Sequence, residues 1–301
     1  MLIRELLAIG SGKLKNSLEA EILLSFVLGM SKEEMIARDD IEVSTDASIK
    51  LFLKYVDEVS SGKPVAYILK SKEFYGLDFY VDERVLVPRP ETEMIVDLVL
   101  EYLNEENFAS GKYSSNVDEE TGSIDFGMDF KMLDVGTGSG NIPCAVLHNF
   151  DNVMAEAVDI SPDALEVAVK NREYHLLEDR IQIYESDLLE NVEDEFFDVI
   201  TANLPYVGTV TSNFVEEGVK KFEPAVALFA GEDGFDLHRR LFKELREKEM
   251  DFNLLIGEFG DGQIEIVKKE LAENFPAEKF ETEVKNDLAG IPRVYIVRKR
   301  R

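Results

Sequence analysis

Two different spacings of hydrophobic positions divide the chain. Up to about residue 70, apolar residues recur every three or four positions, as on the buried face of a helix; one such face carries Ala20, Leu23, Leu24, Val27 and Leu28, and another Ile49, Phe52, Leu53 and Val56. From Lys131 onward, short apolar runs alternate with helical patterns. Such alternation is typical of an open parallel sheet joined by right-handed crossovers.

The second half is predicted as strands at 131–136, 154–160, 180–186, 196–203, 252–260, 280–287 and 292–299, with helices at 141–150, 161–175, 236–248 and 262–275. The last two strands are adjacent in sequence, which indicates a closing hairpin. Ser161 and Pro162 are typical of the first turn of a helix.

The segment between the two halves shows hairpin and loop signals. Residues 73–81 and 84–87 are expected to pair as a hairpin, and Pro88 and Pro90 stiffen the chain after it. Thr92 is expected to cap the helix that follows. Residues 104–130 are polar and rich in Gly and Ser, which favours a long surface loop or disordered insertion.

Composition narrows the choice of partner. The 301 residues are enough for two domains, and 33 basic against 61 acidic residues give a net charge of -28. This charge disfavours a stable nucleic-acid partner, because nucleic-acid affinity depends on Lys and Arg. It suits a cationic ligand or a basic protein, although a solvated acidic surface that keeps the protein soluble is the more ordinary explanation.

Cysteine, histidine and hydropathy exclude further classes. A single Cys144 allows no internal disulfide, and three scattered histidines show no metal-ligand spacing. No apolar run is long enough to span a bilayer, and the first residues lack a secretion-signal pattern. We expect a cytoplasmic protein with no metal site and no membrane segment.

A glycine-rich loop follows the first predicted strand of the α/β half. The sequence L-D-V-G-T-G-S-G spans Leu133 to Gly140 and leads directly into a helix. Glycines there let the backbone turn tightly and approach a ligand at the carboxyl edge of the sheet. Nicotinamide enzymes favour G-x-G-x-x-G, but Asn141 occupies the third glycine position. A nicotinamide oxidoreductase is therefore disfavoured.

Acidic residues stand at or near the ends of three successive predicted strands, at Asp134, Asp159 and Asp187. An acid at the end of the second strand is placed to accept hydrogen bonds from a ribose diol. A carboxylate beside the glycine loop repels a pyrophosphate but attracts an ammonium group. S-adenosylmethionine has a ribose, an ammonium group and a sulfonium, so it fits all three acids. Simple capping of strand ends is the alternative.

The fourth strand of this series ends in Asn203, Leu204, Pro205 and Tyr206. A planar nitrogen, in an amide or an aminopurine, is a weak nucleophile unless acceptors on its N–H bonds orient it. The Asn203 side-chain oxygen and the Leu204 carbonyl are predicted to be those acceptors. Pro205 would fix the turn, and Tyr206 would offer a flat face to the planar group. An ordinary strand-ending turn is the alternative.

The chain resembles the peptide-chain release factor glutamine methyltransferases of the HemK/PrmC type. The resemblance covers nearly the whole length and is carried by motifs within residues 18–40, 62–93, 133–147, 157–171, 203–207, 223–241 and 286–299. The sequence V-L-V-P-R-P-E-T-E, at 85–93, is the most specific of these. N-L-P-Y departs from the family's usual N-P-P-Y, and insertion 104–130 is longer than expected.

The resemblance implies a fold and an activity. It implies a helical substrate-recognition domain at 1–70, a β-hairpin and linker at 71–91, and a seven-stranded Rossmann-like, mostly parallel methyltransferase sheet at 92–301. It implies methylation by S-adenosylmethionine, leaving S-adenosylhomocysteine, of the glutamine amide in the Gly-Gly-Gln motif of release factors, by a monomer. The expected donor site comprises Asp134, Gly136, Thr137, Gly138, Ser139, Gly140, Asp159, Ile160, Asp187, Leu188 and Asn203, and the expected catalytic residues are Asn203, Leu204, Pro205 and Tyr206.

Other functions stay open at this point. N-L-P-Y also occurs in adenine methyltransferases that act on ribosomal RNA, although the net charge of -28 disfavours RNA or DNA as substrate. A non-catalytic docking module is a third hypothesis, opposed by the intact glycine loop. Arg89, Glu91 and Glu93 are interpreted as a charge network between domains.

Overall fold

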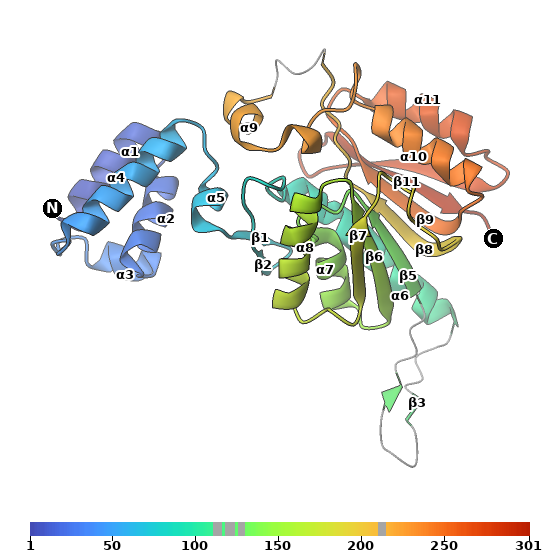
Figure 1. The fold of residues 1–301 in the computed structure, drawn as a ribbon, viewed down its shortest axis with the longest axis horizontal. Coiled ribbons are helices and arrows are strands. Elements are labelled where there is room, and N and C mark those ends of the chain that lie inside the picture. The colour runs from blue at the N-terminus through green and yellow to red at the C-terminus, as the bar shows by residue number, and fades with distance from the viewer. Residues whose placement is uncertain (111–115, 118–123, 126–129, 210–214) are drawn as a thin grey trace.

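The computed structural model consists of a helical unit, a connecting segment and a seven-stranded sheet covered by helices (Figure 1). The structure describes residues 1–110, 116–117, 124–125, 130–209 and 215–301. In this part of the chain, none of the helices combines the length and the apolar character that a membrane-spanning helix needs.

The helical unit packs around a core of its own. Its helices are α1 (Ile3–Leu14), α2 (Ser17–Leu28), α3 (Lys32–Ala37) and α4 (Asp46–Ser60). Ala20, Leu23 and Leu24 on the predicted face of α2 are completely buried. Burying each such leucine contributes about 1.5–3 kcal/mol. Gly29, with a φ of 63°, ends α2 in the left-handed conformation that glycine adopts without strain.

The connecting segment contains α5 (Val65–Leu69) and a hairpin of β1 (Lys72–Phe74) with β2 (Leu77–Phe79). The expected pairing of 73–81 with 84–87 is wrong, because the hairpin turns within the first of these stretches, at Tyr75 and Gly76. Residues 84–87 form a loop whose Val85 and Val87 are buried beside helix α8 (Pro162–Tyr174). Buried and half-buried residues alternate here as in a strand, which explains the wrong prediction, but this loop pairs with no strand of the described residues.

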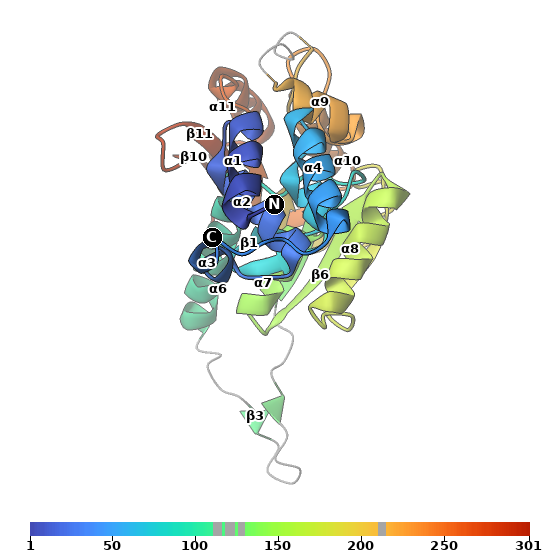
Figure 2. The ribbon, with the colours of Figure 1, turned by 90° about the vertical axis from the view of Figure 1, so that its left-hand side faces the viewer.

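Figures 1 and 2 place the helical unit to one side of the sheet. Its end meets the other half of the chain at α9 (Glu217–Phe222). Here Gly62 and Gly218 touch backbone to backbone, since a Cβ added to Gly62 would lie 2.7 Å from the Gly218 Cα. Lys63 also pairs with Glu83, at 2.9 Å. The contact admits no side chain at either glycine.

The sheet has the strand order β10-β11-β9-β8-β5-β6-β7. The strands β5 to β9 run parallel, and β11 pairs antiparallel with both β9 and β10. This is the predicted seven-stranded, mostly parallel sheet with a closing hairpin. Its strands are β5 (Phe130–Val135), β6 (Val153–Asp159), β7 (Ile181–Glu185), β8 (Phe196–Ala202), β9 (Asp251–Glu258), β10 (Phe280–Asn286) and β11 (Pro292–Lys299).

Helices cover both faces of this sheet. One face carries α6 (Glu93–Ser110), α7 (Asn141–Asn149) and α8 (Pro162–Tyr174), and the other carries α10 (Asp236–Glu247) and α11 (Ile264–Asn274) (Figure 1). The described residues also contain the short 3-10 helices η1 (Pro90–Thr92) and η3 (Ala225–Ala227). The same separation appears in the two large apolar clusters, one on each side of the sheet.

The expected loop at 104–130 begins later than predicted, because α6 continues to Ser110. Residues 104–107 are polar because that part of the helix is exposed or half-buried, and Glu105 pairs with Arg298 of β11 at 3.1 Å. Within the rest of the stretch the structure describes only β3 (Asn116–Val117) paired with β4 (Ile124–Asp125) and the start of β5. The remainder of the expected insertion lies outside the described residues.

Candidate active site

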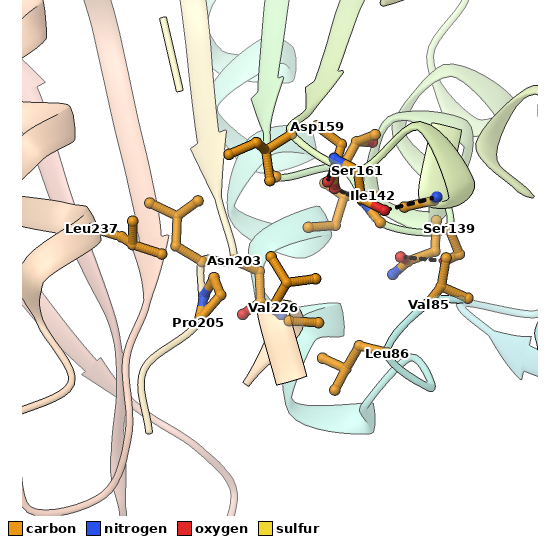
Figure 3. Close-up of a pocket in the computed structure, with 18 of the residues that line it drawn as sticks. Val85, Leu86, Ser139, Ile142, Asp159, Ser161, Asn203, Pro205, Val226 and Leu237 are labelled. Carbon is orange, nitrogen blue, oxygen red and sulfur yellow. Dashed lines mark hydrogen bonds between the residues drawn. The ribbon is translucent and has the colours of Figure 1, made fainter. Parts of the chain in front are cut away.

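The carboxyl ends of the parallel strands surround a cavity of about 250 Å³. Open α/β sheets bind ligands at this edge. Figure 3 shows Ser139, Asp159 and Ser161 on one side of the cavity and Asn203, Pro205 and Leu237 on the other. Among the predicted site residues, those that line it are Gly136, Thr137, Gly138, Ser139, Asp159, Ile160, Asp187, Leu188, Asn203, Leu204 and Pro205.

The glycine loop joins β5 to α7 and forms the floor of the cavity. The amides of Gly136 and Thr137 donate to the Val158 carbonyl of β6 at 2.8 and 2.9 Å, which fixes the loop to its neighbouring strand. Gly138 has a φ of 54°, and a Cβ added there would meet nothing within 4 Å. The loop therefore leaves open space where a side chain would otherwise stand.

Asn171 of α8 supports this loop from behind. It is fully buried, and its side-chain amide donates to the Ser139 carbonyl at 2.8 Å. It also exchanges hydrogen bonds with both backbone groups of Tyr80, at 2.7 and 3.0 Å. One side chain thus fastens the connecting segment to the glycine loop.

Asp159 ends β6 beside the loop. Its carboxylate accepts from the Gly138 amide and from the Ser161 amide, both at 2.9 Å. Burial raises its pKa, and these backbone N–H groups oppose the rise. Each carboxylate oxygen can accept a further bond. The geometry suits the two hydroxyls of a ribose.

The wall beyond Asp159 is mostly apolar. It contains Ile160, Leu188, Val226, Phe229 and Leu237. Leu188 has a φ of 50°, a strained value for leucine, and the Ser186 hydroxyl holds it by donating to its carbonyl at 2.9 Å. Asp187 is paired with Arg240 at 3.0 Å. A flat, largely apolar ring system with polar edges fits this wall.

Asn203 follows the last residue of β8 and lines the opposite side. Its side-chain nitrogen donates to the Thr92 hydroxyl at 3.0 Å. Leu204 is buried, and its side chain lies 2.8 Å from the place that a Cβ on Gly136 would occupy. Gln263 donates to the Tyr206 carbonyl at 2.9 Å. The turn after β8 is thereby held at both of its ends.

Three predicted site residues lie outside the cavity wall. Asp134 is buried within β5, where it accepts from the Thr201 hydroxyl at 2.6 Å, and burial raises its pKa to about 6. Gly140 caps α7 at a φ of 75° and packs on Ala168 of α8. Tyr206 turns away, and its hydroxyl donates to Glu258 at 3.2 Å. These residues support the cavity from behind.

The structure adds Glu258 and Glu223, which the sequence analysis did not name, and gives Thr92, Arg89 and Glu93 specific partners. The Thr92 hydroxyl does not cap the following helix as predicted. It donates to Glu258 at 2.7 Å and accepts from the Asn203 side chain. Glu258 is the last residue of β9, so the search for acidic residues at the ends of parallel strands would also have found it. Arg89 lines the cavity and pairs with the buried Glu223 at 2.6 Å. Glu93 accepts from the Tyr75 amide at 2.9 Å.

Known protein families match two separate parts of the chain. Residues 5–69 match the PrmC N-terminal domain, and residues 121–225 match the methyltransferase small domain. A release factor glutamine methyltransferase from Clostridium acetobutylicum is 33% identical over 92% of this chain and 90% of its own length. Proteins of the same name from Koribacter versatilis and Rhodopirellula baltica are 34% and 35% identical, each over 94% of this chain and over 91% and 89% of their own lengths.

Solved structures with a similar fold include the human METTL16 catalytic domain bound to the MAT2A 3'UTR hairpin 6, with a TM-score of 0.56 and 13% identity over 77% of this chain and 79% of that chain. The N-terminal domain of human METTL16 in complex with SAH matches with a TM-score of 0.51 and 13% identity, over 80% of this chain and 83% of that one. At this identity the likeness shows the methyltransferase fold alone.

Proposed function

Because the chain belongs to the release factor glutamine methyltransferase family, we propose that it transfers a methyl group from S-adenosylmethionine to a glutamine side-chain amide of a peptide-chain release factor. The observation that carries this proposal is the identity of 33–35%, which extends over about nine-tenths of each relative. It includes both the helical unit and the sheet.

The cavity fits this donor. The open space at Gly138 and the paired oxygens of Asp159 suit a ribose, and the apolar wall with Ile160 and Leu188 suits an adenine. A sulfonium supplies a methyl group whose bonding electrons return to sulfur as it leaves. Because hydrogen bonds to β6 fix the glycine loop, a bound donor would already be oriented when the acceptor arrives.

The turn after β8 is proposed to hold the acceptor. The Asn203 side-chain oxygen and the Leu204 carbonyl would accept hydrogen bonds from the two N–H bonds of the glutamine amide. Its nitrogen then forms the new N–C bond and loses one proton to solvent. Pro205 also lines the cavity. Tyr206 contributes from outside the cavity, through Glu258, and not by presenting its ring.

We further propose a division of labour along the chain. Residues 1–70 would recognise the release factor, residues 71–91 would link the two parts, and residues 92–301 would carry out transfer. Leu204 replaces the usual proline without loss of the carbonyl that the reaction needs. The Gly-Gly-Gln motif is the expected target.

Mass spectrometry tests the proposal. A release factor incubated with this protein and S-adenosylmethionine should gain one methyl group on the glutamine of Gly-Gly-Gln. A release factor with that glutamine changed to alanine is the matched control and should gain none. Ribosomal RNA is tested in parallel with labelled donor. Label found only in the RNA, or no label anywhere, would reject the proposal.

A further inference from the structure

A chain of hydrogen bonds connects Asn203 and Thr92, which both line the cavity, to Glu258 behind them. The Asn203 side-chain nitrogen donates to the Thr92 hydroxyl at 3.0 Å, and the Thr92 hydroxyl donates to Glu258 at 2.7 Å. The Tyr206 hydroxyl donates to the other oxygen of Glu258 at 3.2 Å. Thr92 and Glu258 are almost completely buried, with exposed fractions of 1% and 2%. Three separate segments therefore meet around one carboxyl group.

The chemistry of these groups decides which of them donates and which accepts in each hydrogen bond. An ionised carboxylate can only accept, and a hydroxyl has a single proton. With the Thr92 proton committed to Glu258, the Thr92 oxygen is left to accept from a neighbour. Asn203 must then turn its NH₂ group toward Thr92. Its side-chain oxygen is left for the cavity.

This matters because an asparagine amide has two nearly equal shapes related by a flip. One orientation presents an acceptor to the cavity, and the other presents a donor. Only the acceptor orientation can bind an N–H bond of a substrate amide. Thr92 is the residue that distinguishes the two.

We propose that Thr92 and Glu258 are positioning residues that hold the Asn203 amide in its acceptor orientation for methyl transfer. The inference rests on the proposed function and extends it to two residues outside the N-L-P-Y motif. It also gives the threonine of the P-R-P-E-T-E segment a physical role. Thr92 acts through Asn203 and does not need to touch the substrate.

The protonation state of Glu258 adds a second consequence. Burial raises its pKa to about 7. The groups that act on it are the Thr92 and Tyr206 hydroxyls and Arg293 of β11, which lower this pKa, and Glu91 of η1, which raises it. His238 of α10 faces its backbone and is neutral in this range, because burial lowers the histidine pKa to about 3.

A protonated Glu258 can donate to Thr92, and the Thr92 proton is then free to point at Asn203. Asn203 would flip, and the cavity would lose its acceptor. Transfer should therefore rise as pH increases through about 7. Asp159 is not part of this hydrogen-bond chain, so donor binding there should not follow the same pH dependence as transfer.

The test compares Thr92→Val with Thr92→Ser. Valine keeps the shape of threonine and removes the hydroxyl, whereas serine keeps the hydroxyl. Single-turnover transfer to a release factor should fall about tenfold to hundredfold in Thr92→Val, by analogy with the loss of an outer hydrogen bond that orients a metal ligand. Thr92→Ser should recover most of the rate. Calorimetric affinity for S-adenosylmethionine should change much less than the transfer rate in Thr92→Val, and thermal melts should show that both variants are folded.

Glu258→Gln provides an independent arm. It should be slow at all pH values and should lose the rise in rate near pH 7 that the unmodified protein shows. Unchanged transfer by Thr92→Val, or an equal loss in Thr92→Ser, would overturn the inference while leaving the proposed function intact. Failure of the unmodified protein to methylate any release factor would instead overturn the proposed function.

Discussion

Replacing Arg89 by methionine should destabilise the fold far more than replacing its partner Glu223 by glutamine. The Glu223 side chain is 1% exposed and receives its shortest hydrogen bond, 2.6 Å, from Arg89. Its other oxygen accepts from the Val87 amide at a long 3.3 Å. Arg89→Met would leave a buried carboxylate with this one weak donor.

The cost follows from this burial. Removing one partner of a buried ion pair costs about 3–5 kcal/mol, because the remaining charge loses its compensation. The Arg89 side chain is 32% exposed, so water reaches its end of the pair. We therefore expect the lower limit, about 3 kcal/mol, and a fall in Tm of about 6–12 °C for a folded unit of this size. Glu223→Gln should cost much less, since no charge stays behind.

Urea unfolding of the two single variants and of the double variant gives the coupling free energy directly. The double variant should be more stable than Arg89→Met alone, because it also removes the buried charge. The reasoning fails if Arg89→Met is no less stable than Glu223→Gln, or if the two losses simply add. The pair holds the loop at 84–89 against α9, so calorimetry should also show weaker donor binding in Arg89→Met.

Three further predictions concern the cavity and its supports. Asp159→Asn should weaken S-adenosylmethionine binding about 10- to 100-fold, since hydrogen bonds to a charged group contribute about 1.5–3 kcal/mol; calorimetry measures this, and an equal loss in single-turnover rate at saturating donor would contradict a role confined to binding. Gly136→Ala should lower donor affinity about tenfold, because its φ of 73° is strained for alanine and its Cβ would meet Leu204 at 2.8 Å. Gly262→Ala is the control, since it has a similar φ of 81° but no neighbour within 4 Å. Similar donor affinities in the two variants would refute the role of the Leu204 contact. The pKa of Glu258 is about 7 in the folded protein against an ordinary 4.5, so the folded state binds the carboxyl proton more tightly than the unfolded state. This contribution to the free energy of unfolding, about 3 kcal/mol, is full below pH 4.5 and is lost as pH rises to about 7. Urea unfolding at several pH values should show that Glu258→Gln removes this pH dependence, and an unchanged dependence would count against the reasoning.

The sheet could be predicted from the sequence because its signals are local. Each strand of the α/β half is a short apolar run bounded by polar turns, and parallel strands bring their carboxyl ends to one edge. That rule was enough to place Asp159, Asp187 and Asn203 around one cavity. The glycine loop was recognisable for the same reason, since its backbone shape demands glycine at known positions.

The parts that could not be predicted depend on contacts between distant segments. Thr92 had the pattern of a helix cap, and only the packing of η1 against the end of β9 reveals that its hydroxyl serves Glu258. Val85 and Val87 alternate like a strand because α8 and Tyr67 cover them, not because a strand pairs with them. The orientation of Asp134, inward to Thr201, likewise depends on a neighbouring strand.

The contact between Gly62 and Gly218 constrains how the two halves of the protein can move. Because a Cβ at either glycine would overlap the other backbone, the helical unit cannot shift across this contact without displacing α9. The chain continues from α9 into η3, where Val226 and Ala227 form part of the cavity wall. The path from this contact to the cavity wall is therefore the short stretch of chain between α9 and η3.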